Sequence, residues 1–210
     1  HTARYDTLIA DYLTGITEKK PSFPDYLTTS LKRVSVLRYG ENPHQKAAIY
    51  RERTNGLSLA DAKVLQGKEM SFNNYLDTNS ALLLALEFDK KACAVIKHNN
   101  PCGVAVGNTP AEAYKRAVKT DPVSAFGGVV AFNTEMDAEC AKQMVDLFLE
   151  VVIAPSFTKD ALDIFSKKPN VRLLELADMN RKAASWDMKR IAGGLLLQGW
   201  DYSGEDIMSL

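Results

Sequence analysis

The stretch that decides the fold reads AVIKHNNPCG and occupies residues 94–103. Its first residues are apolar and include valine and isoleucine, a composition typical of a buried β-strand. Pro101 and Gly103 follow closely, and we expect them to interrupt any regular continuation. Lys97 and His98 are therefore predicted to lie where a buried strand meets a turn. In open α/β sheets, ligands bind at strand ends of this kind.

Lys97 and His98 are interesting because a lysine beside a histidine is a plausible acid–base pair for catalysis. The same two residues could also be solvated strand-end side chains without a chemical role. The ten residues by themselves favour neither interpretation, so the rest of the chain has to distinguish them.

The segments around this stretch alternate between strand and helix patterns, which indicates an α/β fold. Thr109 begins a capping box with Pro110 at the first helical position, which predicts a helix to about residue 119. We expect further helices over 4–13, 73–88, 137–149 and 158–166, and a linker over 14–29. The expected strands cover 31–37, 62–65, 92–96, 129–132, 151–154, 171–174, 187–191 and 195–198.

Two of the expected helices come with specific predictions about their side chains. Helix 73–88 should have its N-cap at Asn73 or Asn74, and its core face should consist of Leu76, Leu83, Leu84 and Phe88. Helix 137–149 should be capped by Asp137, with Cys140, Met144, Val145 and Phe148 buried. Cys140 is then a core residue without a chemical role.

Two loops have the composition of ligand-binding segments. The first reads RYGENPHQ (residues 38–45) and mixes a guanidinium, a phenol, an imidazole and amides with glycine and proline. The second reads PVSAFGG (residues 122–128), and its two glycines would let the backbone approach a ligand closely. Either loop could also be an ordinary turn, exposed in the first case and needed only for chain reversal in the second.

Composition excludes several classes of protein. The chain has 210 residues, 46% hydrophobic and 25% charged, as in ordinary globular proteins. Because 26 basic residues balance 26 acidic ones, we expect neither nucleic acid nor a membrane surface as the partner. Three widely spaced cysteines indicate a reducing compartment, and no signal peptide or transmembrane run is present, so we expect a cytoplasmic protein. The first residue is His1, which indicates an N-terminus that was cut or processed.

A zinc site is the first alternative to consider, because His98 and the Pro101–Cys102 pair resemble part of a zinc deaminase motif. Those enzymes need Pro-Cys-x-x-Cys and His-x-Glu, but this chain has Ala105 and Asn100 at the corresponding positions. We therefore predict no metal. Cys102 is also disfavoured as a nucleophile, because no orienting triad is recognisable. The chain has neither a P-loop nor a Gly-x-Gly-x-x-Gly motif.

Five stretches together point to a family. In residues 37–45, 66–79, 96–107, 121–132 and 150–155, the chain resembles the bifunctional purine biosynthesis proteins. In that family phosphoribosylaminoimidazolecarboxamide (AICAR) formyltransferase is joined to IMP cyclohydrolase. The resemblance implies that residues 1–29 are the end of the cyclohydrolase domain and a linker. It also implies that residues 30–210 are the first formyltransferase module, with the C-terminal module absent.

The resemblance implies a fold and a reaction. The fold would be a cytidine-deaminase-like three-layer module with a mixed sheet between helices. The reaction would transfer a formyl group from 10-formyltetrahydrofolate, the cosubstrate, to the 5-amino group of AICAR. The family forms homodimers with shared active sites. This chain alone is expected to be inactive, because the family's folate pocket lies in the C-terminal module.

The resemblance also assigns roles to individual residues. His98 matches the family's catalytic histidine and would be the general base. Lys97 matches the neighbouring lysine, which would stabilise the oxyanion or help the folate nitrogen to leave. The implied substrate-binding residues are Arg38, Tyr39, His44, Asn73, Phe126, Gly127 and Glu150, although His44 could equally support its loop.

Two rival interpretations come from other classes of protein. One is a non-catalytic, nucleotide-binding fragment of the same enzyme, and the other is a zinc-dependent deaminase. The Lys97–His98 pair separates formyl transfer from the first rival, because simple nucleotide binding would not require it. A metal analysis of the pure protein would test the zinc-dependent deaminase.

Overall fold

A six-stranded mixed sheet forms the centre of the computed structural model, which describes residues 2–17, 23, 25–52, 56–179 and 186–201. The strand order is β3-β8-β7-β6-β4-β5. Strands β6, β7 and β8 are parallel, whereas β4 is antiparallel to β5 and β6, and β3 is antiparallel to β8. The strands are β3 (Lys63–Gln66), β4 (Ala92–Lys97), β5 (Asn100–Val106), β6 (Gly128–Phe132), β7 (Leu149–Ala154) and β8 (Arg172–Glu175).

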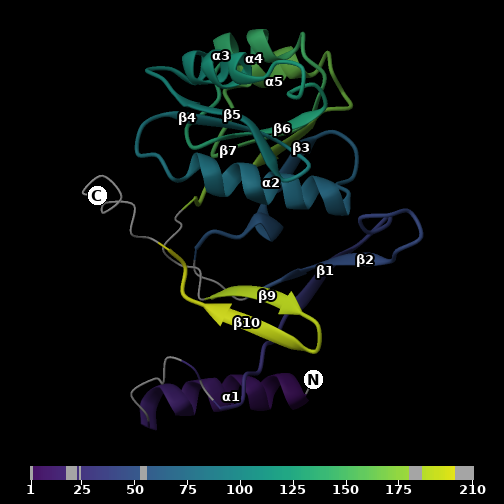
Figure 1. Cartoon of the computed structure of the whole chain (residues 1–210), viewed down its shortest axis with the longest axis vertical. Helices are drawn as coiled ribbons and strands as arrows, with labels where there is room; N and C mark the ends of the chain where they lie inside the picture. Colours follow the sequence, from purple (N-terminus) through teal and green to yellow (C-terminus); the bar gives the residue numbers. More distant parts are fainter. Residues whose placement is uncertain (1, 18–22, 24, 53–55, 180–185, 202–210) are drawn as a thin grey trace.

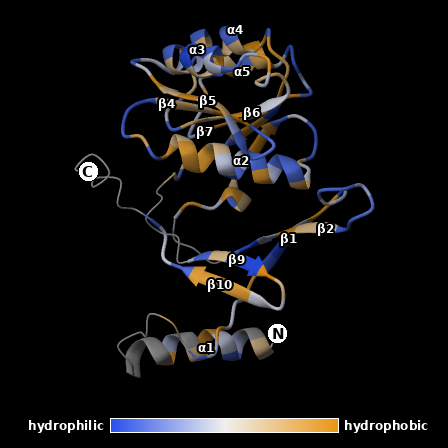
Figure 2. Ribbon diagram, in the orientation of Figure 1, coloured by the Kyte–Doolittle hydropathy of each residue, from blue (hydrophilic) through white to orange (hydrophobic). Residues whose placement is uncertain are grey.

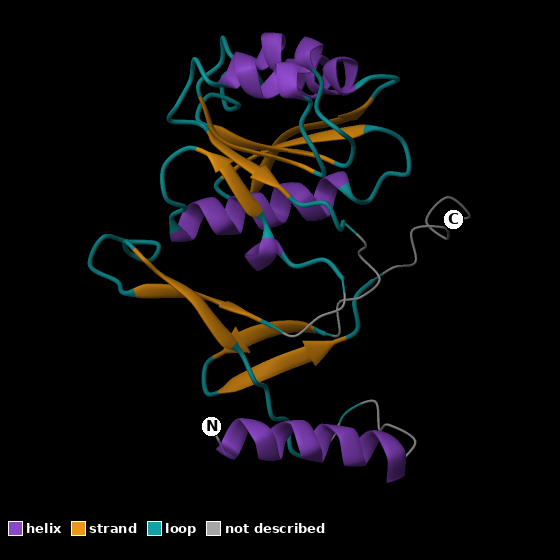
Figure 3. Cartoon of the chain, turned by 180° about the vertical axis from the view of Figure 1, so that it is seen from behind, coloured by secondary structure: helices purple, strands orange, loops and turns teal. Residues whose placement is uncertain are grey.

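Helices cover both faces of this sheet (Figures 1 and 3). One face carries α3 (Pro110–Thr120), α4 (Ala138–Met144) and α5 (Lys159–Phe165), and the other carries α2 (Phe72–Ala85). Successive residues of β4 alternate between the two cores: Cys93 and Val95 belong to the α3–α5 side, Ala94 and Ile96 to the α2 side. The sheet is accordingly hydrophobic between the helical layers (Figure 2). The predicted α/β fold with a mixed sheet between helices is confirmed.

The remaining elements lie outside this three-layer body (Figure 1). They are α1 (Thr2–Thr17), the hairpin of β1 (Lys32–Leu37) and β2 (Ala47–Arg51), the short helix η1 (Leu59–Asp61), and the hairpin of β9 (Asp187–Ile191) and β10 (Gly194–Gln198). The predicted helix over 4–13 and the predicted strands over 187–191 and 195–198 are confirmed, and the two strands pair as a hairpin. The linker predicted over 14–29 falls partly on α1 and partly outside the described residues.

The expectation that Pro101 and Gly103 end regular structure is wrong, because both lie in β5. β5 pairs only with β4 in this sheet, and a proline is tolerated on such an edge strand. The register shifts between Val95, which faces Gly103, and Ile96, which faces Pro101, so Cys102 is the extra residue of a β-bulge. Gly103 has a packing role, because a Cβ there would collide with the carbonyl oxygen of Ala117 in α3.

The core face predicted for α2 is partly wrong. Its buried positions are Ala81, Leu82 and Ala85 with the polar Asn74 and Thr78, whereas Leu76 is 39% exposed. Small residues let α2 lie close to the sheet, and Leu76 instead lines a separate pocket with β2. The N-cap is Ser71, with the Asn74 side chain accepting a hydrogen bond from the Ser71 N–H. The helix ends at Ala85, before Phe88.

Helix α4 is also shorter than predicted. Asp137 caps it as expected, and Cys140 and Met144 are buried, but it ends at Met144, and Leu149 already belongs to β7. Phe148 was expected in the core and is 46% exposed instead. It lies beyond the helix, where its ring contacts that of Phe126.

Candidate active site

Most of the predicted site residues meet at one end of the six-stranded sheet, which we call the site end. The site end consists of the last residues of β3 and β4 and the first residues of β6, β7 and β8. The rule for open α/β sheets places ligands at carboxyl ends of parallel strands. That rule is not followed here, because the parallel strands β6, β7 and β8 present their amino ends, whereas β3 and β4, which are antiparallel to their neighbours, present their carboxyl ends.

His98 lies at the tip of the hairpin between β4 and β5, where the predicted turn is confirmed. The two turn residues are His98 and Asn99, with φ angles of 52° and 58°. Two successive positive φ angles are typical of the type I′ turn, whose twist matches that of the flanking strands. His98 and Asn99 are exposed, so the imidazole stands at the surface of the site end.

The hairpin is fastened to α2 and to itself by side-chain hydrogen bonds. The Asp77 carboxylate accepts hydrogen bonds from the N–H groups of His98, at 3.1 Å, and Asn99, at 2.8 Å. Ser80 donates to the side-chain oxygen of Asn99 at 3.0 Å. The Asn100 amide donates to the His98 carbonyl at 2.8 Å.

Lys97 connects the hairpin to the loop over residues 122–128, which we call the glycine-containing loop. Its ammonium donates to the Phe126 carbonyl oxygen at 2.8 Å, so the two stretches singled out in the sequence are in contact. Gly127 has a φ of 73°, and its N–H donates to the Phe148 carbonyl at 2.8 Å. The positive φ gives a conformational reason for a glycine at residue 127. The Phe126 ring is 57% exposed and lies 5.3 Å from the Phe148 ring, measured between centroids.

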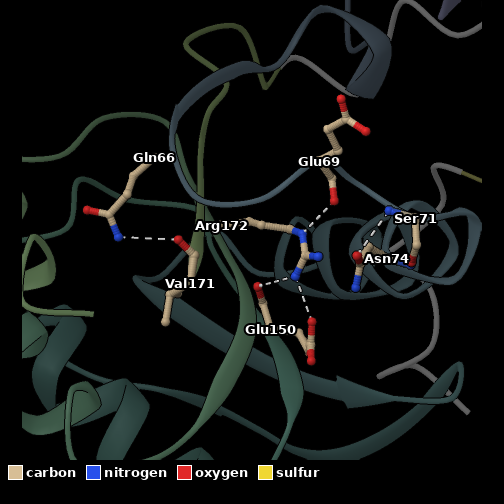
Figure 4. Close-up of polar contacts among 7 residues, drawn as sticks. All are labelled: Gln66, Glu69, Ser71, Asn74, Glu150, Val171 and Arg172. Carbon is tan, nitrogen blue, oxygen red and sulfur yellow. Dashed lines mark hydrogen bonds and ion pairs between the residues drawn. The ribbon is translucent and has the colours of Figure 1, made fainter. Parts of the chain in front are cut away.

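Glu150, predicted to contact the nucleotide, is bonded to an arginine (Figure 4). Its carboxylate accepts from the guanidinium of Arg172 at 2.6 Å, and the same guanidinium donates to the Glu69 carbonyl at 3.0 Å. The Arg172 side chain is only 11% exposed. This partly buried ion pair joins β7 to β8, and the hydrogen bond to Glu69 joins β8 to the segment that enters α2.

The loop over residues 38–45 is a compact turn that reaches α2. The Gly40 N–H donates to the Gln45 carbonyl, and the Asn42 N–H donates to the Gln45 side-chain oxygen, each at 2.8 Å. Asn73 donates to the Glu41 carbonyl at 3.4 Å and so joins this loop to the first turn of α2. Asn73 therefore supports the loop.

The side chains of this loop that were predicted to bind a ligand lie at its surface. The guanidinium carbon of Arg38 lies 5.7 Å from the centroid of the Tyr39 ring, within the range of a cation–π contact. Arg38 and His44 are exposed, and Tyr39 is half-buried.

Cys102 is not placed for nucleophilic chemistry. It is 7% exposed, and burial raises the pKa of its thiol, with Asp121 and Asp77 adding to the rise and Lys97 opposing it. A raised pKa leaves less thiolate, which is the reactive form. Hydrogen bonds from Ser124 lower the pKa of the Asp121 carboxyl, which immediately precedes the loop over residues 122–128.

Asp77 and Arg172 are the residues of the site end that the sequence interpretation missed. Each acts on a segment distant in the chain, and neither belongs to a motif with a recognisable spacing. The available signal was indirect: Asp77 lies one helical turn after Asn73, within the stretch 66–79 singled out above.

Other features of the described residues lie away from the site end. A pocket of about 830 Å³ lies between α3 and α4, and one of about 430 Å³ lies between α2 and β2; neither is lined by Lys97 or His98. Within the described ranges, no three His, Cys, Asp or Glu residues gather as metal ligands would. Among the helices described, none is both long and apolar enough to span a membrane.

Comparison with known proteins gives strong matches along the chain. The PurH proteins, described as bifunctional purine biosynthesis proteins, are 49% identical in Persephonella marina and 47% identical in Caldicellulosiruptor saccharolyticus, each over 207 residues. The protein of the same description from Acidithiobacillus ferrooxidans is 49% identical over 208 residues. The matches cover 96–98% of this chain and 40% of each relative, so the chain spans well under half of their length.

Two further comparisons concern the fold and the family. Among solved structures, Acinetobacter baumannii RibD covers 47% of the chain at a TM-score of 0.38 and 15% identity, which is too low to assign a fold family. The cytidine-deaminase-like label therefore stays a prediction. The family model described as AICARFT/IMPCHase bienzyme matches residues 1–209. The chain thus belongs to the AICARFT/IMPCHase bienzyme family.

Proposed function

We propose that this chain carries the reacting centre for transfer of a formyl group from 10-formyltetrahydrofolate to the 5-amino group of AICAR. The observation that carries the proposal is the contact between Lys97 and the Phe126 carbonyl, because it joins the Lys97–His98 hairpin to the glycine-containing loop. A histidine at an exposed turn beside a fixed lysine ammonium suits proton transfer with charge stabilisation. Family membership supports the same reaction.

The chemistry requires a base because the acceptor is an aromatic amine whose lone pair is delocalised towards the carboxamide. As its nitrogen attacks the formyl carbon, His98 removes the proton from that nitrogen. Lys97 stabilises the oxygen anion of the tetrahedral intermediate or assists the departing folate nitrogen. The bond between the formyl carbon and the folate nitrogen then breaks, that nitrogen takes up the proton held by His98, and tetrahydrofolate leaves.

The nucleotide would be recognised by groups on two loops. Arg38 would form charge-assisted hydrogen bonds with AICAR, and Tyr39 would lie beside it. Phe126 and Gly127 would contact the base through the exposed ring and the backbone. Glu150 would be available to the nucleotide only if it gave up or shared its bond with Arg172.

The wider assembly is part of the same proposal. We use the term full-length protein for a protein that contains this chain and has the length of the curated relatives. In that protein, a second domain would close the IMP ring. We propose a homodimer in which partner subunits complete the formyltransferase sites, with folate and AICAR as the ligands.

The decisive experiment for the site is a crystal structure of the full-length protein with AICAR bound. We expect the 5-amino nitrogen within hydrogen-bond reach of the His98 imidazole, roughly 2.6–3.2 Å or through one water. Binding of AICAR near Arg38 but remote from His98 would favour the non-catalytic, nucleotide-binding interpretation. Binding at a place that includes neither residue would overturn the proposal.

A further inference from the structure

Asp77 directs both of its carboxylate oxygens at the hairpin that holds His98. One oxygen accepts from the His98 N–H at 3.1 Å and the other from the Asn99 N–H at 2.8 Å. Asp77 belongs to α2, whereas His98 belongs to the connection between β4 and β5. This one side chain therefore joins the backbone of the turn to the helical layer.

The turn has a conformation that needs support. His98 and Asn99 both have positive φ angles, which cost free energy for residues other than glycine. Such conformations persist where the surroundings hold them. Here the Asp77 carboxylate supports the turn by accepting two hydrogen bonds. Hydrogen bonds to a charged group are shorter and stronger than those between neutral groups.

Each side chain that bonds around the turn holds a different group. Lys97 is fixed by its own bond to the Phe126 carbonyl. The backbone N–H groups of His98 and Asn99 depend on Asp77, and Ser80 holds only the Asn99 side chain. The Asn100 side chain holds the His98 carbonyl at 2.8 Å, so Asp77 is the side chain that fixes the N–H side of the turn and helps to set the direction of the His98 side chain.

We propose that Asp77 is a positioning residue for formyl transfer, acting through the backbone of His98 without touching the substrate. The inference rests on the proposed role of His98 as general base. An aspartate suits the role because two adjacent N–H groups need two acceptors. An asparagine would keep one acceptor and set an amide NH₂ against the other N–H.

A double-mutant cycle in the full-length protein tests this role. The variants are Asp77→Asn, His98→Ala and their combination, each assayed for formyl transfer with kcat and KM determined separately. We expect Asp77→Asn to lower kcat roughly tenfold to a hundredfold, since small misplacement of a catalytic group has effects of this size. The KM for AICAR should change little. In the His98→Ala background, Asp77→Asn should cause no further loss, because residues that act as a unit are not additive.

Asp137→Asn is the matched control. Its carboxylate also accepts a backbone N–H, that of Cys140 at 2.8 Å, but it caps α4 at the opposite end of the sheet. It should change kcat by less than twofold. The urea unfolding midpoint and the far-UV circular dichroism of every variant report whether this module is folded, and the cyclohydrolase activity of the same polypeptide reports on the other domain only.

The outcomes separate this inference from the proposed function. If Asp77→Asn lowers formyl transfer equally with His98 present or absent, Asp77 has a general structural role and the inference is wrong. An Asp77→Asn variant with normal kcat also overturns it. If His98→Ala itself transfers formyl groups at a near-normal rate, the proposed function fails, and the role of Asp77 fails with it.

Discussion

At the scale of single residues, the site end is held together by hydrogen bonds between segments that are distant in the chain. Lys97 and His98 were found because a buried apolar run ends at them, and the structure places them at that strand end. Asp77 and Arg172 were not found, since their bonds join segments 21 and 22 residues apart, respectively. Such contacts depend on tertiary packing and leave no local pattern.

The Arg38→Ala variant of the full-length protein tests the nucleotide contact. Loss of a charge-assisted hydrogen bond should raise the KM for AICAR roughly tenfold to a hundredfold with a smaller effect on kcat, because ground and transition states lose the same contact. Steady-state kinetics with each substrate varied in turn provide the measurement.

Arg33→Ala is the control for that variant, because Arg33 is an exposed arginine in β1 outside the 38–45 loop. The Arg33→Ala variant should leave the KM for AICAR and kcat unchanged. A raised KM for the folate with an unchanged KM for AICAR would place Arg38 on the other substrate.

At the scale of elements, the order of strands and helices was predictable, and the errors have physical causes. The alternation of patterns gave β4, α3, β6, α4, β7, α5 and β8 in the correct order, with boundaries shifted by a few residues, but β2 and β5 were not predicted. Pro101 and Gly103 were misjudged because an edge strand with a bulge accepts residues that a central strand rejects. The buried face of α2 was misjudged because leucines were weighted above the small residues that allow close approach to the sheet.

Gly103→Ala should destabilise the fold by about 1–3 kcal/mol, the usual range for overpacking a close contact. The added methyl group would collide with the Ala117 carbonyl and push α3 away from β5. The measurement is the midpoint and slope of urea unfolding.

Gly199→Ala is the matched control for Gly103→Ala, because a Cβ at residue 199 would meet nothing within 4 Å. Its midpoint should stay close to that of the parent protein. Equal midpoints for Gly103→Ala and the parent would show that α3 does not depend on this close packing.

At the scale of the whole molecule, the core contains several groups that resist ionisation. Burial raises the pKa of the Cys93 and Cys140 thiols above their ordinary value of 9.0 and that of the Tyr114 phenol above 10.0. These groups remain protonated in the folded chain at a pH where the unfolded chain has lost their protons. The folded state then binds more protons, so its stability falls as the pH rises.

We therefore expect a constant contribution from these groups below about pH 9 and a loss of stability above it. Each thiol can contribute at most about 1.4 kcal/mol per pH unit. The measurement is the urea midpoint between pH 7 and pH 10.5. Cys140→Ala should make this pH dependence shallower, although a cavity would lower its midpoint at every pH. A parent midpoint that stays constant through pH 10.5 would contradict the expectation.

The chain covers 40% of the length of its relatives, so its chemistry is best tested in the full-length protein. The most direct measurement compares formyl transfer and cyclohydrolase activity in one preparation of His98→Ala. We predict that formyl transfer falls at least roughly a hundredfold, as expected for loss of a general base, whereas the cyclohydrolase rate stays within twofold of the parent. Near-normal formyl transfer by this variant would contradict the account.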